Sequence, residues 1–439
     1  MVDKTEKKYK DAIKAAEKDK DHPKIINAYI QLGQHYRGKG DTPKGLTQFE
    51  QAQKTAVKFG YKEIESRLLG LIGYSLQEIG NYEASMKSYR KSLRIAKKID
   101  KPILQLDALL HMGMLMAEQG KNLEAISKLD NALALSIQIN DRNRKLHVAN
   151  LMGNIYLAID SSEKALESYS IALEASRAIK DVQAEAATLI HLGQVFMQDE
   201  IFDTANEHFE KALDLADDID NPHIEIQALN GLMNANDQLG KQKLAIVYGE
   251  QLVNKAKSLG EAPIEIHAIN TLVRLLFLYD KTQEAIPYIE RGLEIGRAQK
   301  DRDWELSFLM NKGISIYMGE DYQNADTILN EALDLAVRMQ KKPEEAGILG
   351  HLSALKADDG DIEASMEYSQ KALDLARQTG NTQIEGEQLV LLASNYQELG
   401  DDEKAAACYE EAIQIFEALE NPELVNLTKE YLAGFQVKE

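Results

Sequence analysis

The chain has 439 residues, a net charge of −20 and an aromatic content of only 6%. A composition this acidic argues against nucleic acid or an anionic membrane as the ligand, because neutralising phosphate groups needs a dense surface of Lys and Arg. Hydrophobic residues make up 44% of the chain, which is enough for a large core built mainly from aliphatic side chains.

The cysteine content and the N-terminal sequence indicate in which cellular compartment the protein is expected. Cys408 is the only cysteine, so an intrachain disulfide and a zinc site made of several cysteines are both excluded. The sequence from Met1 to Lys14 is too charged for a signal peptide, and no apolar run approaches the ~20 residues that a membrane span requires. We therefore expect a cytoplasmic protein without a membrane partner.

Charge is distributed unevenly along the chain. Residues 1–62 contain 14 Lys and Arg against 8 Asp and Glu, whereas residues 344–439 contain 6 against 21. Two interpretations of the acidic end stay open. It is either a solvated outer face, which is the ordinary reason for such a charge, or an acidic tip that docks a basic partner.

The sequence is organised by a pattern that returns every 40 residues. Two columns of small residues can be followed through ten repeats. The first column consists of Gly45, Ser85, Ala125, Ala165, Ala205, Ala245, Ala285, Ala325, Ser365 and Ala405. The second consists of Ala52, Ser92, Ala132, Ala172, Ala212, Leu252, Gly292, Ala332, Ala372 and Ala412. Because stacked repeats share one continuous core, we predict a single solenoid domain over residues 1–439.

Taken in order, the chain begins with a helix over residues 3–19 that is in register with the second helix of the repeat and so forms an N-terminal half repeat. Ten helix pairs then span 22–421, each made of two helices of ~18 residues joined by a tight turn. A last helix over 422–438 repeats the first half of a pair and caps the array. The fold class that we predict is therefore all-α.

Helix starts and stops are marked by residues with a physical reason to lie there. Prolines are tolerated where a helix begins, because the missing N–H has no partner there: Pro23, Pro102, Pro222, Pro263, Pro343 and Pro422. Side chains suited to N-caps are Asp141, Asp181, Asn221, Asp301 and Asn421. Turns within pairs carry Gly40, Gly80, Gly120, Gly240, Gly360 and Gly400, where a positive φ is expected.

In the first helix of most pairs, a further position of the repeat is occupied by small residues, and bulky residues follow three positions later. The small ones are Gly33, Gly73, Gly113, Gly153, Gly193 and Gly313. With Tyr82, Ala125, Tyr89 and Ala132, this column resembles the tetratricopeptide repeat in its 40-residue form, as in kinesin light chains, bacterial peptide-pheromone receptors and the sensor ends of signal-transduction ATPases. The resemblance implies a right-handed α-α superhelix whose first helices line a concave groove that binds peptides or proteins.

Two repeats, 222–259 and 262–299, depart from this pattern. Met233 and Val273 replace the glycine of the first helix, Leu252 replaces a small residue of the second, and Pro287 lies inside a helix. Because bulk at a close contact pushes helices apart, we predict altered curvature near residues 230–290.

Polar residues recur on one face of the first helices in the middle of the chain. Asparagine has both donors and an acceptor, so a ladder of asparagines can hold the backbone of an extended peptide, and Arg274 would add a site for a carboxylate. The predicted peptide-binding residues are His147, Asn150, Asn154, Gln194, Asn230, Asn234, His267, Asn270 and Arg274. The alternative is that these residues are ordinary polar residues on a solvent-exposed helix face and bind no ligand. Lys312, in an otherwise apolar column, is either a lysine with a buried stem or a further charge in the groove.

Neither metal chemistry nor catalysis is indicated by the sequence. No two histidines stand at i and i+4, and there is no phosphate-binding loop or nucleophile elbow. We therefore expect no enzyme, no metal and no cofactor. The predicted function is a non-catalytic scaffold that binds a peptide or an extended protein segment. The alternatives are the ligand-sensing arm of a larger signal-transduction regulator and a self-assembling structural solenoid, so self-association stays open.

Overall fold

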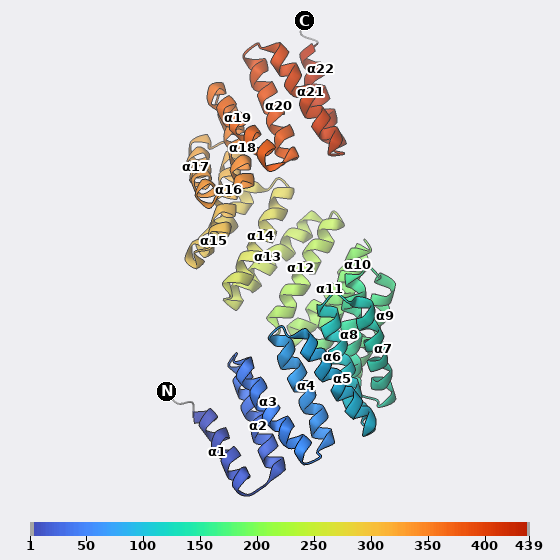
Figure 1. The fold of residues 1–439 in the computed structure, drawn as a ribbon. Helices are drawn as coiled ribbons and strands as arrows, with labels where there is room; N and C mark the ends of the chain where they lie inside the picture. The colour runs from blue at the N-terminus through green and yellow to red at the C-terminus, as the bar shows by residue number, and fades with distance from the viewer. Residues whose placement is uncertain (1–3, 437–439) are drawn as a thin grey trace. The chain divides into compact units, whose positions relative to one another are not determined.

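The computed structural model of the protein describes residues 4–436, and in this range the chain forms 22 α-helices and no strand. It divides into two compact units, Met1–Lys241 and Gln242–Glu439, which we call unit 1 and unit 2. The boundary falls in the turn inside the repeat 222–259. Each unit is an α-α solenoid in which successive helices pack against one another (Figure 1). That the whole chain acts as one domain stays a prediction.

The helices of unit 1 are α1 (Lys4–Lys18), α2 (His22–Gly38), α3 (Thr42–Lys58), α4 (Lys62–Glu78), α5 (Tyr82–Lys98), α6 (Pro102–Glu118), α7 (Asn122–Gln138), α8 (Arg142–Ala158), α9 (Ser162–Ile179), α10 (Val182–Gln198), α11 (Phe202–Asp218) and α12 (Pro222–Gln238). Those of unit 2 are α13 (Gln242–Leu259), α14 (Ala262–Leu278), α15 (Thr282–Gln299), α16 (Arg302–Met318), α17 (Tyr322–Met339), α18 (Lys342–Asp358), α19 (Ile362–Thr379), α20 (Thr382–Glu398), α21 (Asp402–Ala418) and α22 (Pro422–Gln436).

The predicted order of elements is confirmed. Helix α1 is the N-terminal half repeat, α2 to α21 are the ten pairs along the sequence, and α22 is the C-terminal helix. Residue 3 and residues 437–438, which the sequence assigned to the terminal helices, lie outside the described residues. In each pair the even-numbered helix is the first helix and the odd-numbered one the second.

All five predicted N-caps make the expected bond. The Asp141 carboxylate accepts from the backbone N–H of Arg144 at 3.0 Å, and the Asp181 carboxylate accepts from Ala184 at 2.9 Å. Asn221, Asp301 and Asn421 cap α12, α16 and α22 in the same way. A side-chain oxygen here satisfies a backbone donor that has no partner inside its own helix.

The turns also follow the prediction, since Gly40, Gly80 and Gly360 have φ values of +79°, +78° and +81°. The same left-handed conformation occurs where the sequence has no glycine, at Asp160 with φ +53° and Glu320 with φ +64°. Repeat geometry therefore imposes this conformation whatever the residue, and glycine only reduces its steric cost.

The glycine column of the first helices is explained by a large residue 16 positions later on the second helix. A Cβ on Gly73 would lie 2.5 Å from the Tyr89 ring, and one on Gly153 would lie 2.5 Å from the Tyr169 ring. Phe209 fills two such spaces, because a Cβ on Gly193 would lie 2.6 Å from its ring and one on Gly231 would lie 2.5 Å from it. The glycines are therefore packing residues.

In the sequence of the irregular repeat 222–259, the glycine and the bulky residue have exchanged columns. Met233 stands where other repeats have glycine, and Gly249, 16 residues later, stands where they have Tyr or Phe. Both residues are buried. The altered curvature that we predicted near residues 230–290 stays a prediction.

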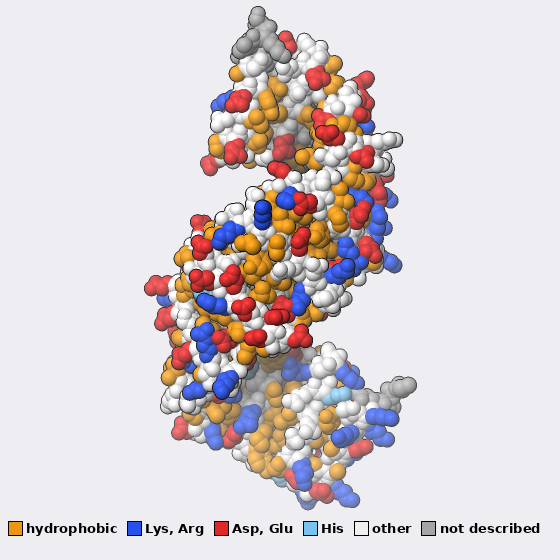
Figure 2. Space-filling model, turned by 180° about the vertical axis from the view of Figure 1, so that it is seen from behind, with side chains coloured by type: hydrophobic (Ala, Val, Ile, Leu, Met, Phe, Trp, Pro, Cys, Tyr) orange, Lys and Arg blue, Asp and Glu red, His pale blue; other side chains and the backbone are white. Residues whose placement is uncertain are grey.

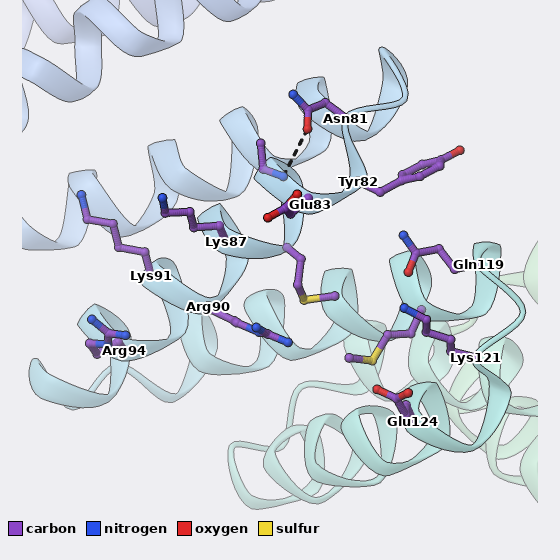
Figure 3. Close-up of a pocket in the computed structure, with 13 residues that line it drawn as sticks. Asn81, Tyr82, Glu83, Lys87, Arg90, Lys91, Arg94, Gln119, Lys121 and Glu124 are labelled. Carbon is purple, nitrogen blue, oxygen red and sulfur yellow. Dashed lines mark hydrogen bonds between the residues drawn. The ribbon is translucent and has the colours of Figure 1, made fainter.

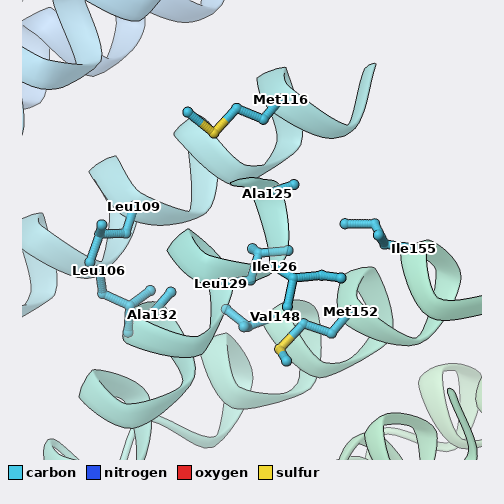
Figure 4. Packing of buried hydrophobic residues seen from close by; sticks show 10 residues of the cluster. All are labelled: Leu106, Leu109, Met116, Ala125, Ile126, Leu129, Ala132, Val148, Met152 and Ile155. Atoms are coloured by element: carbon cyan, nitrogen blue, oxygen red, sulfur yellow. The ribbon is translucent and has the colours of Figure 1, made fainter. Parts of the chain in front are cut away.

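The core consists of apolar side chains from consecutive helices. In the centre of unit 1, residues of α6, α7 and α8 form one cluster: Leu106, Leu109, Met116, Ala125, Ile126, Leu129, Ala132, Val148, Met152 and Ile155 (Figure 4). Ala125, Leu129 and Ala132 are fully buried. Since second helices such as α5, α7 and α9 each pack between two first helices, these repeats depend on their neighbours for their core.

Carboxylates are buried at one recurring position of the first helices, which the sequence reasoning missed. The Glu265 side chain is only 5% exposed, and it accepts hydrogen bonds from Arg291 Nε at 2.7 Å and Nη2 at 3.1 Å. Five repeats earlier, Glu65 is held by Lys62 at 2.8 Å and Lys91 at 3.3 Å. Burial acts to raise the pKa of Glu65, but the bonds from Lys62 and Lys91 outweigh it and hold this pKa below its usual value.

The surface carries charges of both signs, with hydrophobic side chains exposed between them, as the face drawn in Figure 2 shows. Leu123 is the extreme case, at 78% exposure. Among residues 4–436, no helix has the length and apolar character needed to cross a membrane.

Candidate functional site

In unit 1 the predicted ladder lies on three first helices that contact one another. Helix α8 carries His147, Asn150 and Asn154, α10 carries Gln194, and α12 carries Asn230 and Asn234. Helix α10 contacts both α8 and α12, so these residues belong to adjoining rows of the solenoid. None of the six is buried.

Two of these asparagines already have partners within the protein. The Tyr169 hydroxyl of α9 donates to Asn154 Oδ1 at 2.6 Å. The Thr188 hydroxyl of α10 shares its single proton between the Ala184 carbonyl at 2.8 Å and Asn150 Oδ1 at 3.3 Å. Both bonds use the carbonyl oxygen, and within residues 4–436 no bond from either amide NH2 group, a double donor, is recorded. The bonds therefore orient the two amides.

Gln194 contacts a histidine that lies three residues earlier on the same helix, α10. His191 Nδ1 lies 3.2 Å from Gln194 Oε1, and its ring stacks on Tyr169 with centroids 5.3 Å apart. His111 stacks on Tyr89 at the same centroid distance two repeats earlier. Burial lowers the pKa of both histidines. A neutral imidazole is thus part of the packing in both repeats.

We expect this burial to make stability pH-dependent. Unfolded histidine binds a proton near pH ~6.5, whereas His111 and His191 have a lower pKa when folded, so the unfolded chain binds more protons and stability falls as the pH drops from 7 toward 5. The double variant His111→Gln, His191→Gln should have a smaller difference between its urea midpoints at pH 7 and pH 5.5 than the wild type. An unchanged difference would show that other groups control this pH range.

In unit 2 the ladder is confined to α14, which carries His267, Asn270 and Arg274. The His267 ring meets the Trp304 ring of α16 edge to face, with centroids 5.1 Å apart. His267 and Arg274 are exposed, and Asn270 is half-buried. The structure thus divides the predicted site into a part on unit 1 and a part on unit 2.

Lys312 is explained by an ion pair. Its Nζ lies 2.8 Å from the Glu290 carboxylate of α15, and its side chain is only partly exposed. This contact fits the first of the two interpretations, in which the stem is buried and the charge reaches a partner at the surface.

A hollow with a strongly basic rim was missed by sequence reasoning. It lies between the second helices α5 and α7, has a volume of about 930 Å³ and is floored by Met86 and Met116. Figure 3 shows its labelled lining side chains, of which five are cations: Lys87, Arg90, Lys91, Arg94 and Lys121. A charge count for each helix would have found it, because α5 has six cations and one carboxylate.

Other candidate groups have ordinary surroundings. Cys408 is half-buried against the cluster formed by α19 to α22, and burial raises the pKa of its thiol, which keeps it neutral. Within the described residues, no three His, Cys, Asp or Glu side chains come together as a metal site.

The geometry defines a class of protein, the α-α repeat solenoid, and comparisons with known proteins define the family. A tetratricopeptide repeat model matches residues 24–98 and 344–418, and a model of anaphase-promoting complex subunit 5 matches residues 75–155. Residues 24–98 and 344–418 are thus tetratricopeptide repeats, and the 40-residue pattern of the chain resembles that family throughout. The matching models describe a repeat and a complex subunit, and neither describes an enzyme.

Individual relatives cover parts of the chain. Outer dynein arm-docking complex subunit 4 of Homo sapiens is 28% identical over 233 residues, which are 51% of this chain and 34% of that protein. Regulatory protein RapG of Bacillus subtilis is 28% identical over 157 residues, which are 35% of this chain and 40% of that protein. The crystal structure of the apo form of RapI matches with a TM-score of 0.56 at 13% identity, over 81% of this chain and 99% of that one. The last likeness shows the fold alone.

Proposed function

We propose that the protein is a non-catalytic scaffold of the cytoplasm that binds a peptide or an extended segment of a partner protein along its first helices. The ladder residues of α8, α10, α12 and α14 would hold the backbone of that segment. The similarity to a docking-complex subunit supports a role in protein interaction.

The observation that carries the proposal is the row of oriented amides in unit 1. Within residues 4–436 no bond from the amide NH2 group of Asn150 or Asn154 is recorded, while Tyr169 and Thr188 hold their carbonyl oxygens. An extended peptide presents carbonyl oxygens along its length, and amides on adjoining helices can bind them without regard to the peptide's side chains. Arg274 adds a bidentate donor suited to a carboxylate.

Removing the ladder should abolish partner binding and leave folding unchanged. We expect the triple variant Asn230→Ala, Asn270→Ala, Arg274→Ala to lose capture of its partner from a lysate of the source cell, because hydrogen-bond donors on both units disappear. Melting should be unaffected, since Asn230 and Arg274 are exposed and Asn270 is half-buried. The measurement is affinity capture with the partner identified by mass spectrometry.

The matched control removes similar groups from second helices. Asn131, Asn254 and Arg338 are exposed on α7, α13 and α17. Their triple alanine variant should still capture the partner. If the ladder variant captures as well as this control, the first helices are not the binding site.

A second candidate is that the chain forms the ligand-sensing arm of a regulator. The similarity to a protein named as regulatory, RapG, favours it. In that case a small ligand, rather than a protein segment, should protect the chain from unfolding. A thermal-shift screen with peptides and small metabolites separates the two candidates.

A further inference from the structure

Helix α5 has a charge opposite to that of the chain as a whole. It carries Lys and Arg at six positions and one Glu, in a protein of net charge −20. The second helix three repeats later, α11, has one Lys against six Asp and Glu. Since both are second helices of the same repeat, the repeat itself does not require positive charge there.

The geometry gathers these cations around the hollow described above. Helix α5 packs against α4 and α6, and α7 packs against α6 and α8, so α5 and α7 flank the end of α6. Met116 of α6 and Met86 of α5 form an apolar floor between them. Figure 3 shows Lys87, Arg90 and Arg94 along α5.

Most of the rim cations have no carboxylate partner within the protein. Lys91 pairs with Glu65 at 3.3 Å. For Lys87, Arg90, Arg94 and Lys121, the described part of the chain records no ion pair, and Glu83 and Glu124 are the carboxylates that share the rim. Several like charges without counter-charges repel one another, and an anionic partner relieves this repulsion.

We propose that this α5–α7 hollow binds an acidic, extended segment of a partner protein. Lys87, Arg90 and Arg94 stand on successive turns of α5, and a helical turn advances about 5.4 Å. In an extended chain, every second side chain points to the same side, at intervals of roughly 6.7 Å. Carboxylates at alternate positions therefore match the row of cations approximately, and Arg can donate two parallel hydrogen bonds to a carboxylate.

The floor sets a second requirement on the segment. Methionine side chains adapt their shape to apolar groups, so an aliphatic residue among the acidic ones would cover Met86 and Met116. The site lies mainly on the second helices α5 and α7 and uses none of the ladder residues, so it is separate from the function proposed above.

Fluorescence anisotropy with a synthetic peptide tests the proposal on the full chain. The peptide has about ten residues, with Glu at every second position except near the centre, where that position is Leu. We expect the variant Lys87→Glu, Arg90→Glu, Arg94→Glu to bind this peptide about tenfold more weakly than the wild type does. The ladder variant Asn230→Ala, Asn270→Ala, Arg274→Ala should bind the peptide like the wild type. Circular dichroism verifies that each variant is folded.

The control variant makes the same change in net charge elsewhere. It is the triple variant Lys211→Glu, Lys243→Glu, Lys257→Glu, which alters exposed positions on α11 and α13. This variant should keep the wild-type affinity for the peptide. Equal weakening in both variants would overturn the proposal, because the effect would then come from the overall field. Equally tight binding of an oligothymidylate of the same charge, or no binding of the peptide by the wild type, would overturn it as well.

Discussion

The variant Gly73→Ala should be less stable than the wild type by about 2 kcal/mol, although alanine is the better helix former. The added Cβ would lie 2.5 Å from Tyr89 Cε1 and 2.7 Å from Cδ1. Tyr89 cannot move away easily, since it is fully buried and its hydroxyl donates to Gln77 at 3.2 Å. Equilibrium unfolding in urea measures the change.

The same helix supplies the control. Gly70 lies three residues earlier in α4, and a Cβ there would have no heavy atom within 4 Å. Gly70→Ala should therefore stabilise the protein by roughly 0.5–1 kcal/mol through helix propensity alone. If both alanines stabilise, the close contact between α4 and α5 is not present in solution.

The variant Arg291→Met should cost about 2 kcal/mol of stability. It leaves the buried Glu265 carboxylate without the two hydrogen bonds that Arg291 donates. The full cost of breaking a buried pair is reduced here, because the Arg291 side chain is 37% exposed and water screens it. Urea unfolding of the full chain measures the loss.

Two further variants test the cause. Adding Glu265→Met to Arg291→Met should recover most of the stability, since no charge is then left buried. Lys91→Met, at the equivalent position of unit 1, should cost less, because Lys62 still holds Glu65 at 2.8 Å. A large loss for Lys91→Met and a small one for Arg291→Met would contradict this account.

The helices, caps and turns could be predicted because each depends on local chemistry that a 40-residue period displays ten times. Asp141 and Asp181 cap helices through bonds to residues three positions away, and Gly80 adopts a φ that its own lack of a side chain permits. Such features need no knowledge of distant contacts.

Features that depend on contacts between helices were harder to predict. The burial of Glu265 could not be predicted, because its partner Arg291 lies 26 positions later in the sequence. The charge on α5 was missed for a different reason, because the sequence was compared by columns of small residues and the charge of each helix was not counted.

Each residue of the ladder was predicted from the sequence. Whether a partner protein binds along these residues is what an experiment has to test. Side chains such as Asn150 and Asn154 were singled out by residue type and spacing, whereas their hydrogen-bond partners required the structure. Tyr169 and Thr188 hold Asn154 and Asn150 through bonds of 2.6 Å and 3.3 Å that no repeat pattern indicates.

Site-specific photo-crosslinking tests the central claim most directly. A photoreactive amino acid replaces Asn154 on α8, Asn230 on α12 or Asn270 on α14, and in control proteins it replaces Asn254 on α13 or Arg338 on α17. After irradiation in a lysate of the source cell, the account predicts that one partner segment is cross-linked from all three first-helix positions and from neither control. Cross-links to that segment from the second-helix positions alone would contradict it.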